Sequence, residues 1–349
     1  MAGKGADVEI FDYRCPEVES SHDPARSVER SGLYRGLKNL PVKLRKHAVF
    51  DQFRADRLWL SSPVGPEEVH RAGQDYAILV AGSDQVWSPR FSGRDETYLL
   101  GFVEGERRYS YAASIGENEL DAADRQRLRR AIGEFACVSV RERQTARLLE
   151  EMGVPSRVDV DPTLLMGKAF WEGVAQAPGR DGYILVYTIQ PPCRLLDYAR
   201  ALAERTGREV VYLNNERRGN RDFRHARYST PEEFLGWFRD ADYVLTNSFH
   251  GTAFSVVFSK RFKVEVETMG RRNARAEALL EQCELTDATL GASPRDWEFA
   301  YDWDCAKEKL EDATRDSQAY LASIVDAARS QRGASAFAER RPRPDERWE

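Results

Sequence analysis

The sequence predicts a two-domain α/β protein whose sheets are mostly parallel. Short apolar runs alternate with longer amphipathic stretches, which is the pattern of strands followed by helices. The chain has 349 residues, a length that favours two domains, and 42% of its residues are hydrophobic, enough to fill real cores. In open sheets of this kind, ligands bind at the carboxyl ends of the strands.

The first domain is expected to contain five strands separated by polar and helical segments. The expected strands are residues 8–13, 76–81, 108–114, 138–140 and 158–160. Residues 20–70 are polar and rich in arginine, and we expect them to be helical in part. Helices are predicted over residues 121–135 and 145–152, where the residue pattern is helical.

A shift toward glycine, proline and charge at residues 178–182 marks the expected domain boundary, so the first domain would span 1–178 and the second 179–303. Strands of the second domain are expected at residues 183–187, 210–213, 243–246 and 263–266. Helices are expected at 195–206 and after Thr230, because Thr followed by Pro is a strong helix start.

The C-terminal part is expected to form one long helix over residues 304–330 that packs back on the rest of the protein. Residues 331–349 are rich in Arg, Pro and Glu, a composition that favours disorder.

Composition and charge exclude several classes of function. The formal net charge of −5 does not indicate a nucleic-acid partner. The five cysteines are scattered and form no C-x-x-C pair, which favours reduced thiols in a cytoplasm and argues against a zinc site. The N-terminus has no apolar signal core, and no run approaches the ~20 apolar residues of a membrane span. We therefore expect a cytoplasmic protein without a transmembrane segment and without a metal.

The stretch DYVLTNSFHGTAFSVVF, residues 242–258, places a histidine and a glycine between two segments that both look buried. We expect a strand, a turn and then a helix over residues 252–258. Gly251 and Thr252 would then lie at the helix start, where unpaired N–H groups and the helix dipole favour an anion. His250 would project from the loop at the carboxyl edge of the strand. The alternative is a core histidine in a tight turn.

Polar side chains also follow three other expected strands, at Asp84, at Arg141 and at Asp161. Each position by itself could be an ordinary turn or a surface charge. An Arg directly after a buried strand is nevertheless placed to meet an anion, and Glu142 could simply hold its guanidinium in place. We expect all four polar stretches to lie at the carboxyl edges of the two sheets.

Seven motifs in these segments resemble the polysaccharide pyruvyl transferase family in order and spacing, over about residues 7–325. The motifs are GSDQVW at 82–87, YAASIG at 111–116, SVRER at 139–143, DPTLL at 161–165, TPEEF at 230–234, DYVLTNSFHGTAFS at 242–255 and RRNAR at 271–275. The combination of GSDQVW with SFHGT makes this resemblance a specific one.

The resemblance implies two Rossmann-like domains facing a cleft, as in GT-B glycosyltransferases. It also implies transfer of a pyruvyl group from phosphoenolpyruvate to two hydroxyls of a glycan, which forms a cyclic ketal. His250 becomes the candidate general acid and Arg141 a candidate anion ligand. The further substrate-binding candidates are Ser248, Gly251, Thr252, Asp84, Asn273 and Arg275.

The implied partners are phosphoenolpyruvate as donor and a sugar or lipid-linked glycan as acceptor, with no cofactor and with a homo-oligomer as an open possibility. The implied setting is polysaccharide biosynthesis for a bacterial cell envelope. Two alternatives stay open at this point: a GT-B glycosyltransferase that uses a nucleotide sugar, and an inactive truncated relative.

The start of the chain departs from the family pattern. Members of the family usually have an additional strand, a small-residue loop and a helix before the strand that residues 8–13 resemble, whereas this sequence begins with Met-Ala-Gly-Lys-Gly. In a doubly wound sheet the first strand is central. We therefore expect the first domain to lack that strand and residues 8–13 to pair on one side only.

Overall fold

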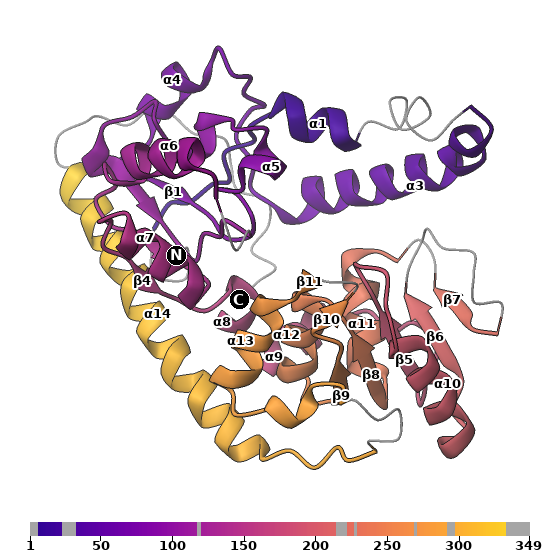
Figure 1. Cartoon of the computed structure of the whole chain (residues 1–349). Coiled ribbons are helices and arrows are strands. Elements are labelled where there is room, and N and C mark those ends of the chain that lie inside the picture. The colour runs from indigo at the N-terminus through magenta and orange to yellow at the C-terminus, as the bar shows by residue number, and fades with distance from the viewer. Residues whose placement is uncertain are drawn as a thin grey trace. The chain divides into compact units, whose positions relative to one another are not determined.

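The computed structural model divides the chain into two compact units, residues 1–161 with 315–349, and residues 162–314 (Figure 1). The residues that the structure describes are 6–22, 33–116, 120–213, 222–226, 229–268, 271–291 and 297–332. The predicted disordered tail at 331–349 lies outside this part of the chain from residue 333 onward. Each unit contains parallel strands with helices between them, so the α/β prediction is confirmed.

Four short parallel strands form the sheet of the first unit. They are β1 (Leu79–Ala81), β2 (Arg108–Ser110), β3 (Ser139–Val140) and β4 (Arg157–Val158). β1 pairs with β2 and β3 pairs with β4, while single bridges from Tyr109 to Cys137 and from Ala113 to Val140 join the two pairs. The resulting order is β1-β2-β3-β4, with each strand shorter than the apolar run that predicted it.

Residues 8–13 are extended but form only isolated bridges. Parallel bridges join Ile10 to Leu60 and Tyr13 to Val64, and the amide of Ile10 donates to the Trp59 carbonyl at 2.8 Å. In the described part of the chain, the backbone hydrogen bonds that link residues 8–13 to another extended segment all go to residues 59–64. The Ile10 side chain is 49% exposed, so one of the predicted strand's apolar residues does not enter the core.

Helices of the first unit cover its sheet and extend from it. They are α1 (Pro16–His22), α3 (Leu33–Arg57), α4 (Val69–Ala72), α5 (Pro89–Ser92), α6 (Ala122–Ile132) and α7 (Arg143–Glu151). Leu128 and Ile132 of α6 and Leu149 of α7 are fully buried and pack with Val140 of β3 in one apolar core. The predicted helices at 121–135 and 145–152 are therefore confirmed, with boundaries shifted by a few residues.

The long C-terminal helix α14 (Trp303–Arg332) belongs to the second unit up to Thr314 and to the first unit from Arg315. Its second part is tied to the first unit by buried hydrogen bonds. The Ser317 hydroxyl accepts from the Val160 amide at 3.1 Å, and the Tyr320 hydroxyl donates to the Ser110 carbonyl at 2.9 Å. The bounds of α14 lie within two residues of the expected helix at 304–330, and its second part packs on the first unit.

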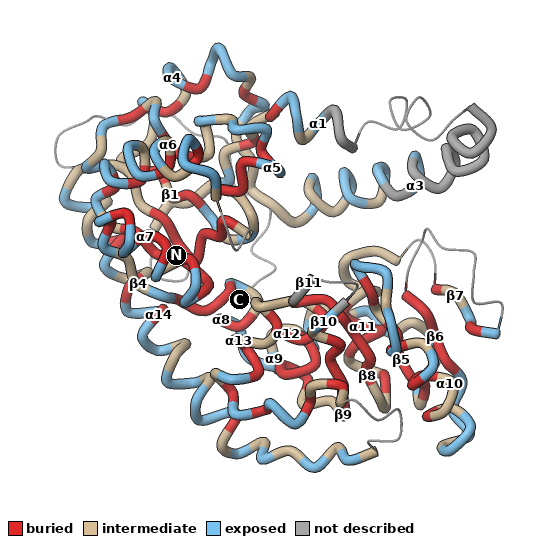
Figure 2. Tube along the Cα trace, viewed as in Figure 1, coloured by how far each residue is buried: buried red, intermediate tan, exposed pale blue. Residues whose placement is uncertain are grey.

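Five parallel strands form the sheet of the second unit, in the order β7-β6-β5-β8-β9. They are β5 (Ile184–Tyr187), β6 (Val210–Leu213), β7 (Arg224–Ala226), β8 (Tyr243–Thr246) and β9 (Arg261–Val264). Ile184 lies opposite Val210 on one side and Tyr243 on the other. The central strands are almost wholly buried (Figure 2), as expected of a sheet covered by helices on both faces.

The helices of the second unit are α8 (Pro162–Leu165), α9 (Lys168–Val174), α10 (Leu195–Thr206), α11 (Pro231–Asp240), α12 (Phe249–Val257) and α13 (Ala274–Gln282), beside a short antiparallel pair, β10 (Glu267–Thr268) and β11 (Arg271–Arg272). α10 has the predicted bounds. α11 begins at the predicted cap, where Thr230 and Glu233 form a capping box.

The structure divides the chain at Asp161–Pro162, whereas the composition placed the boundary at residues 178–179. Residues 162–178 pack on the second unit. The Trp171 ring lies edge-on to Phe254 at 5.4 Å, and the Gln176 amide donates to the Glu232 carbonyl at 2.9 Å. These contacts join residues that are far apart in the sequence, so the local composition could not predict them.

The close approach of residue 176 to α11 yields a stability prediction. A Cβ at Gly236 would lie 1.8 Å from the Gln176 carbonyl oxygen, so Gly236→Ala should destabilise the protein by about 1–3 kcal/mol through overpacking. The matched control is Gly173→Ala in α9, where a Cβ meets nothing within 4 Å and Ala should stabilise by roughly 0.5–1 kcal/mol. Urea unfolding measures both, and equal effects would mean that residue 176 does not pack on α11.

Candidate functional site

The strand order of the second unit reverses direction between β5 and β8. From β5 the chain moves through α10 to β6 on one side, and from β8 it moves through α12 to β9 on the other. Right-handed crossovers in opposite directions place these two helices on opposite faces of the sheet. The carboxyl ends of β5 and β8 therefore form a topological switch point, where open α/β sheets bind ligands.

Asn247 is 2% exposed and links the two loops at this switch point. Its Oδ1 accepts from the amide of Ile189 at 2.9 Å, and its Nδ2 donates to the carbonyl of Gln190 at 3.0 Å. Both residues follow β5, while Asn247 itself follows β8. A buried side-chain amide with partners on both of its polar ends fixes the separation of the two loops.

Ser248 caps the helix that follows β8, and α12 begins at Phe249. The helix therefore starts three residues before the predicted start at residue 252. The Ser248 hydroxyl accepts from the Gly251 amide at 3.3 Å, and the Ser248 carbonyl accepts from the Thr252 amide at 2.9 Å. The prediction that these two amides are available to an anion is wrong, because both are already bonded within the first turn of the helix.

His250 consequently lies on the first turn of α12 rather than in a loop. Its side chain is partly exposed, and its ring lies edge-on to Phe249 with the centroids 5.3 Å apart. The next residue must be glycine, because a Cβ at Gly251 would lie 2.2 Å from Thr246 Oγ1 and 3.1 Å from the Tyr187 ring. Gly251 thus brings the first turn of α12 close to the ends of β8 and β5.

Tyr187 is a site residue that the sequence reasoning missed. It ends β5, and its ring would lie 3.1 Å from a Cβ at Gly251, in the first turn of α12. Burial raises the pKa of the Tyr187 phenol above its ordinary value, while the nearby Ser248 side chain acts in the opposite direction. The phenol therefore stays protonated at neutral pH and is a neutral partner at the start of α12.

Asn273 connects a further helix to the switch point. Its Nδ2 donates to the Asn247 carbonyl at 2.9 Å, and its Oδ1 caps α13 by accepting from the Ala276 amide at 3.3 Å. Arg275 lies on the first turn of the same helix with its side chain partly buried. Five of the predicted site residues thus belong to one hydrogen-bonded region or adjoin it directly: Ser248, His250, Gly251, Thr252 and Asn273.

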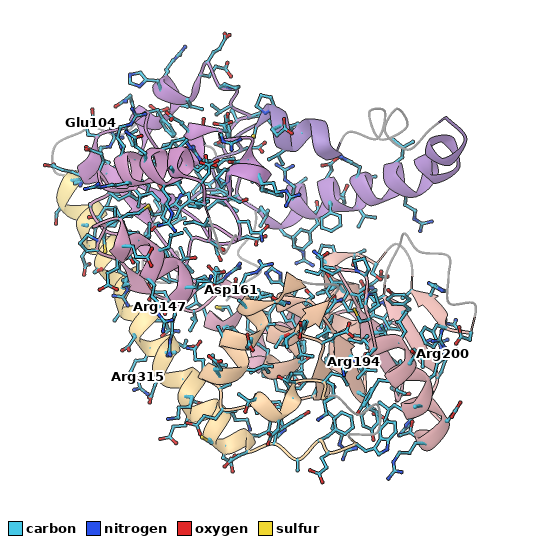
Figure 3. The ribbon with its side chains drawn as sticks, viewed as in Figure 1. Glu104, Arg147, Asp161, Arg194, Arg200 and Arg315 are labelled. Atoms are coloured by element: carbon cyan, nitrogen blue, oxygen red, sulfur yellow. The ribbon has the colours of Figure 1, made fainter. Side chains whose placement is uncertain are left out.

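The polar strand ends of the first unit form a second cluster around Arg141. The guanidinium donates to Glu142 Oε1 at 2.9 Å and to Asp161 Oδ2 at 2.6 Å, and it lies 3.5 Å from Asp84 Oδ1. Ser83 also donates to Asp161, at 3.2 Å. The expectation that the first three polar stretches share one edge of the sheet is therefore confirmed. Asp161, labelled in Figure 3, is 3% exposed.

The Arg141 cluster contains one cation and three carboxylates. Burial opposes the charge on Arg141, but Glu142 and Asp161 outweigh this effect and raise the pKa of the guanidinium above its ordinary value. Its side chain is only 3% exposed. Asp84 is 62% exposed at the side chain and has a φ of 69°, in the left-handed region that Asp tolerates better than most residues. The role of Arg141 as a substrate ligand stays a prediction, and its contacts give it a structural role.

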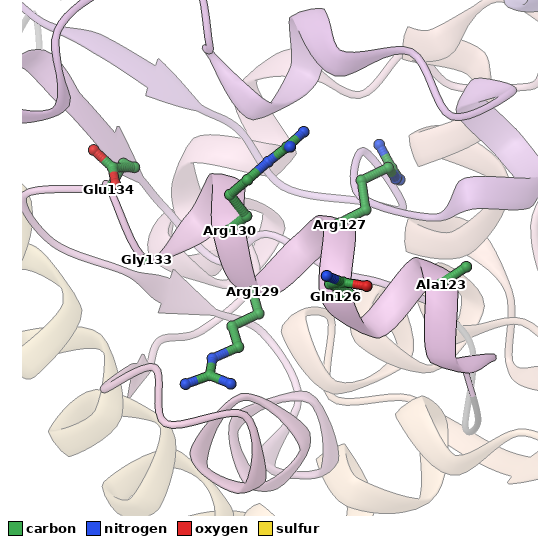
Figure 4. A pocket seen from close by; sticks show the side chains of 7 residues that line it. All are labelled: Ala123, Gln126, Arg127, Arg129, Arg130, Gly133 and Glu134. Carbon is green, nitrogen blue, oxygen red and sulfur yellow. The ribbon is translucent and has the colours of Figure 1, made fainter.

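A hollow of ≈720 Å³ lies along α6 of the first unit (Figure 4). It is lined by Ala123, Gln126, Arg127, Arg129, Arg130, Gly133 and Glu134. None of the predicted site residues lines it. Arg127 lies 3.8 Å from Asp124, and Arg130 lies 3.8 Å from Glu96, so two of the three guanidinium groups already have acidic neighbours. The hollow is a groove along one helix and is not the site that the motifs indicate.

The fold and the strand-end residues define an α/β protein with a candidate ligand site at a topological switch point. The family model for polysaccharide pyruvyl transferase matches residues 1–262. The chain therefore belongs to the polysaccharide pyruvyl transferase family, as its motifs predicted. No curated protein sequence matches the chain.

Two solved structures resemble the chain at low identity. A candidate UDP-N-acetylglucosamine 2-epimerase from Listeria monocytogenes is 12% identical, with a TM-score of 0.44 over 93% of this chain and 91% of that one. The UDP-GlcNAc 2-epimerase of Methanocaldococcus jannaschii is 11% identical, with a TM-score of 0.38 over 86% of this chain and 97% of that one. Similarity at this level says nothing about ligands or reaction.

Across the described ranges, no helix is both long and apolar enough to cross a membrane. In the same ranges, His, Cys, Asp and Glu side chains form no group of three that could hold a metal ion.

The Arg141 cluster yields the second prediction. Arg141→Ala should destabilise the protein by about 3–5 kcal/mol, because it leaves Glu142 and Asp161 buried without their cation. Arg147→Ala is the control, since Arg147 is exposed on α7 and its removal should change stability by less than about 0.5 kcal/mol. Chemical denaturation followed by circular dichroism compares the two. A wild-type midpoint for Arg141→Ala would show that the guanidinium is not held by these carboxylates in solution.

Proposed function

We propose that this protein transfers a pyruvyl group from phosphoenolpyruvate to two hydroxyls of a glycan or glycan precursor, forming a cyclic ketal and releasing phosphate. Membership of the polysaccharide pyruvyl transferase family supports a transferase. The observation that carries the finer proposal is the position of His250, which is partly exposed on the first turn of α12 at the switch point between β5 and β8.

The reaction requires a proton donor that works near neutral pH. Protonation of the methylene carbon of phosphoenolpyruvate makes its C2 an oxocarbenium-like centre, which a glycan hydroxyl attacks with loss of its proton. The C2–O bond to phosphate then breaks, and the second hydroxyl closes the ketal with loss of its proton. Histidine suits the first step, because its ordinary pKa lies close to neutrality. In this proposal His250 is that general acid.

The surroundings of His250 fit a positioned acid. Ser248 caps its helix, Gly251 lets the first turn approach Thr246 and Tyr187, and Asn247 holds the neighbouring loop. A rigid backbone around a catalytic group favours a productive geometry. Asn273 and Arg275 lie at the start of α13, and the proposal assigns them, with Arg141 and Asp84 of the first unit, to substrate binding.

The proposed enzyme needs neither a metal nor a redox cofactor, because the chemistry needs only proton transfer and charge stabilisation. We place it in the cytoplasm. All five cysteines are free thiols, which suits a reducing compartment. The proposed acceptor is a sugar or a lipid-linked glycan. The family supports a glycan acceptor, and the ketal needs two hydroxyls close enough to close one ring.

The reaction class is tested by mass spectrometry of candidate acceptors after incubation with phosphoenolpyruvate. A gain of one pyruvate minus one water, with an equal amount of phosphate released, is the expected outcome. Release of a nucleotide from a sugar nucleotide, with no use of phosphoenolpyruvate, would instead identify a glycosyltransferase. Absence of both activities over a broad set of acceptors would contradict the proposal and favour an inactive relative.

The role of His250 yields the third prediction. His250→Ala should lower turnover by about 10²–10⁴-fold, the usual contribution of a positioned general acid. Its melting temperature should stay near that of the wild type, because the histidine is only partly buried. His70→Ala, which removes an exposed histidine of the first unit, is the control and should keep full turnover. Unchanged turnover in His250→Ala would show that His250 is not the general acid.

A further inference from the structure

The start of α10 carries an unusual internal contact. α10 follows β5, the first strand of the second unit, and in a sheet of this order the helix after the first strand is the one whose free N–H groups receive phosphates. Here the Glu265 carboxylate accepts from the amides of Cys193 at 3.0 Å, Arg194 at 2.6 Å and Leu195 at 3.2 Å. Arg194 is labelled in Figure 3.

Glu265 is held firmly in this position. The residue is 2% exposed and directly follows β9, and its own amide donates to the Thr246 carbonyl at the end of β8 at 2.9 Å. A buried carboxylate is costly unless it is compensated, and three N–H groups with the positive end of a helix supply that compensation. If Glu265 swung away, both the carboxylate and the helix start would lose their partners.

We propose that Glu265 is a specificity-determining residue, which fills the anion position at the start of α10 and keeps nucleoside diphosphates from binding there. An incoming diphosphate would meet a fixed negative charge where it needs donors, and the amides of residues 193–195 are already used. Asn247 bonds to Ile189 and Gln190 on the same loop, so the loop is tied at two places and offers no rearranged set of amides.

The consequence for the donor rests on the proposed function. With the α10 side occupied, a donor with a single phosphate would have to bind on the α12 side of the switch point, where His250 lies. The exclusion of diphosphates does not depend on pyruvyl transfer. The two inferences can therefore fail separately.

The first test removes the carboxylate and asks whether small anions replace it. Glu265→Ala should melt at a lower temperature than the wild type, and sodium formate should recover at least half of the loss. Sodium chloride at equal ionic strength should not. The wild type should show no formate-specific rise. Glu233→Ala is the matched control, because Glu233 also accepts a backbone amide at a helix start but is less buried, so formate should not restore its stability.

A local readout comes from the exposed thiol of Cys193, whose amide is one of the three donors. Formate or inorganic pyrophosphate should slow alkylation of Cys193 by iodoacetamide in Glu265→Ala and leave its rate unchanged in the wild type. Peptide mass spectrometry reports this rate separately from those of the other cysteines. Failure of formate to restore stability or protect Cys193 in a folded Glu265→Ala protein would overturn the proposal.

The wild-type protein supplies a test that does not require a stable variant. UDP and inorganic pyrophosphate should neither raise its melting temperature beyond the ionic-strength control nor protect Cys193. A saturable rise together with protection of Cys193 by UDP would place a diphosphate at the start of α10 and overturn the proposal. If this selectivity holds and phosphoenolpyruvate is not turned over, the proposed function alone fails.

Discussion

The buried amide of Asn247 is the constraint on which the rest of the candidate site depends. It has to satisfy an acceptor and a donor away from water, and it does so with the backbone of Ile189 and Gln190 after β5. Its own carbonyl receives the Asn273 side chain, which also caps α13. The ends of β5 and β8 and the start of α13 are therefore held at one place. These contacts also position His250, which lies three residues after Asn247.

Each unit neutralises a buried charge at its strand ends with groups of its own. In the first unit, carboxylates of Glu142 and Asp161 surround Arg141, and in the second, three amides at the start of α10 surround Glu265. Buried charges without such partners would oppose folding. Groups that are used in this way are less available to a substrate. The first turn of α12, which carries a partly exposed histidine, is the part of the second unit's switch point that our proposals leave for chemistry.

Local patterns predicted the strands and helices of the second unit well. The bounds of α10, β6 and β8 agree with the prediction, because buried strands and capped helices leave clear signals in apolar runs and capping residues. The predicted start of α12 at residue 252 was wrong, because Gly251 suggested a turn. In the structure Ser248 caps the helix, and Gly251 is needed for close packing on Thr246. Helices α8, α9 and α13 and strands β7, β10 and β11 were missed, because short elements held by long-range packing carry little periodicity.

The sequence by itself determined the α/β class, the family and the residues at the strand ends, because these depend on hydrophobic patterning and on short motifs that are local in the chain. Only the tertiary structure decided what those residues contact. It showed that Arg141 is enclosed by carboxylates, that the amides of Gly251 and Thr252 are already bonded, and that Glu265 occupies the start of α10. Glu265 and Arg194 are 71 positions apart, and no local pattern relates them. Parallel sheets bring strand ends together only through crossovers, so the partners of a strand-end residue are set by topology.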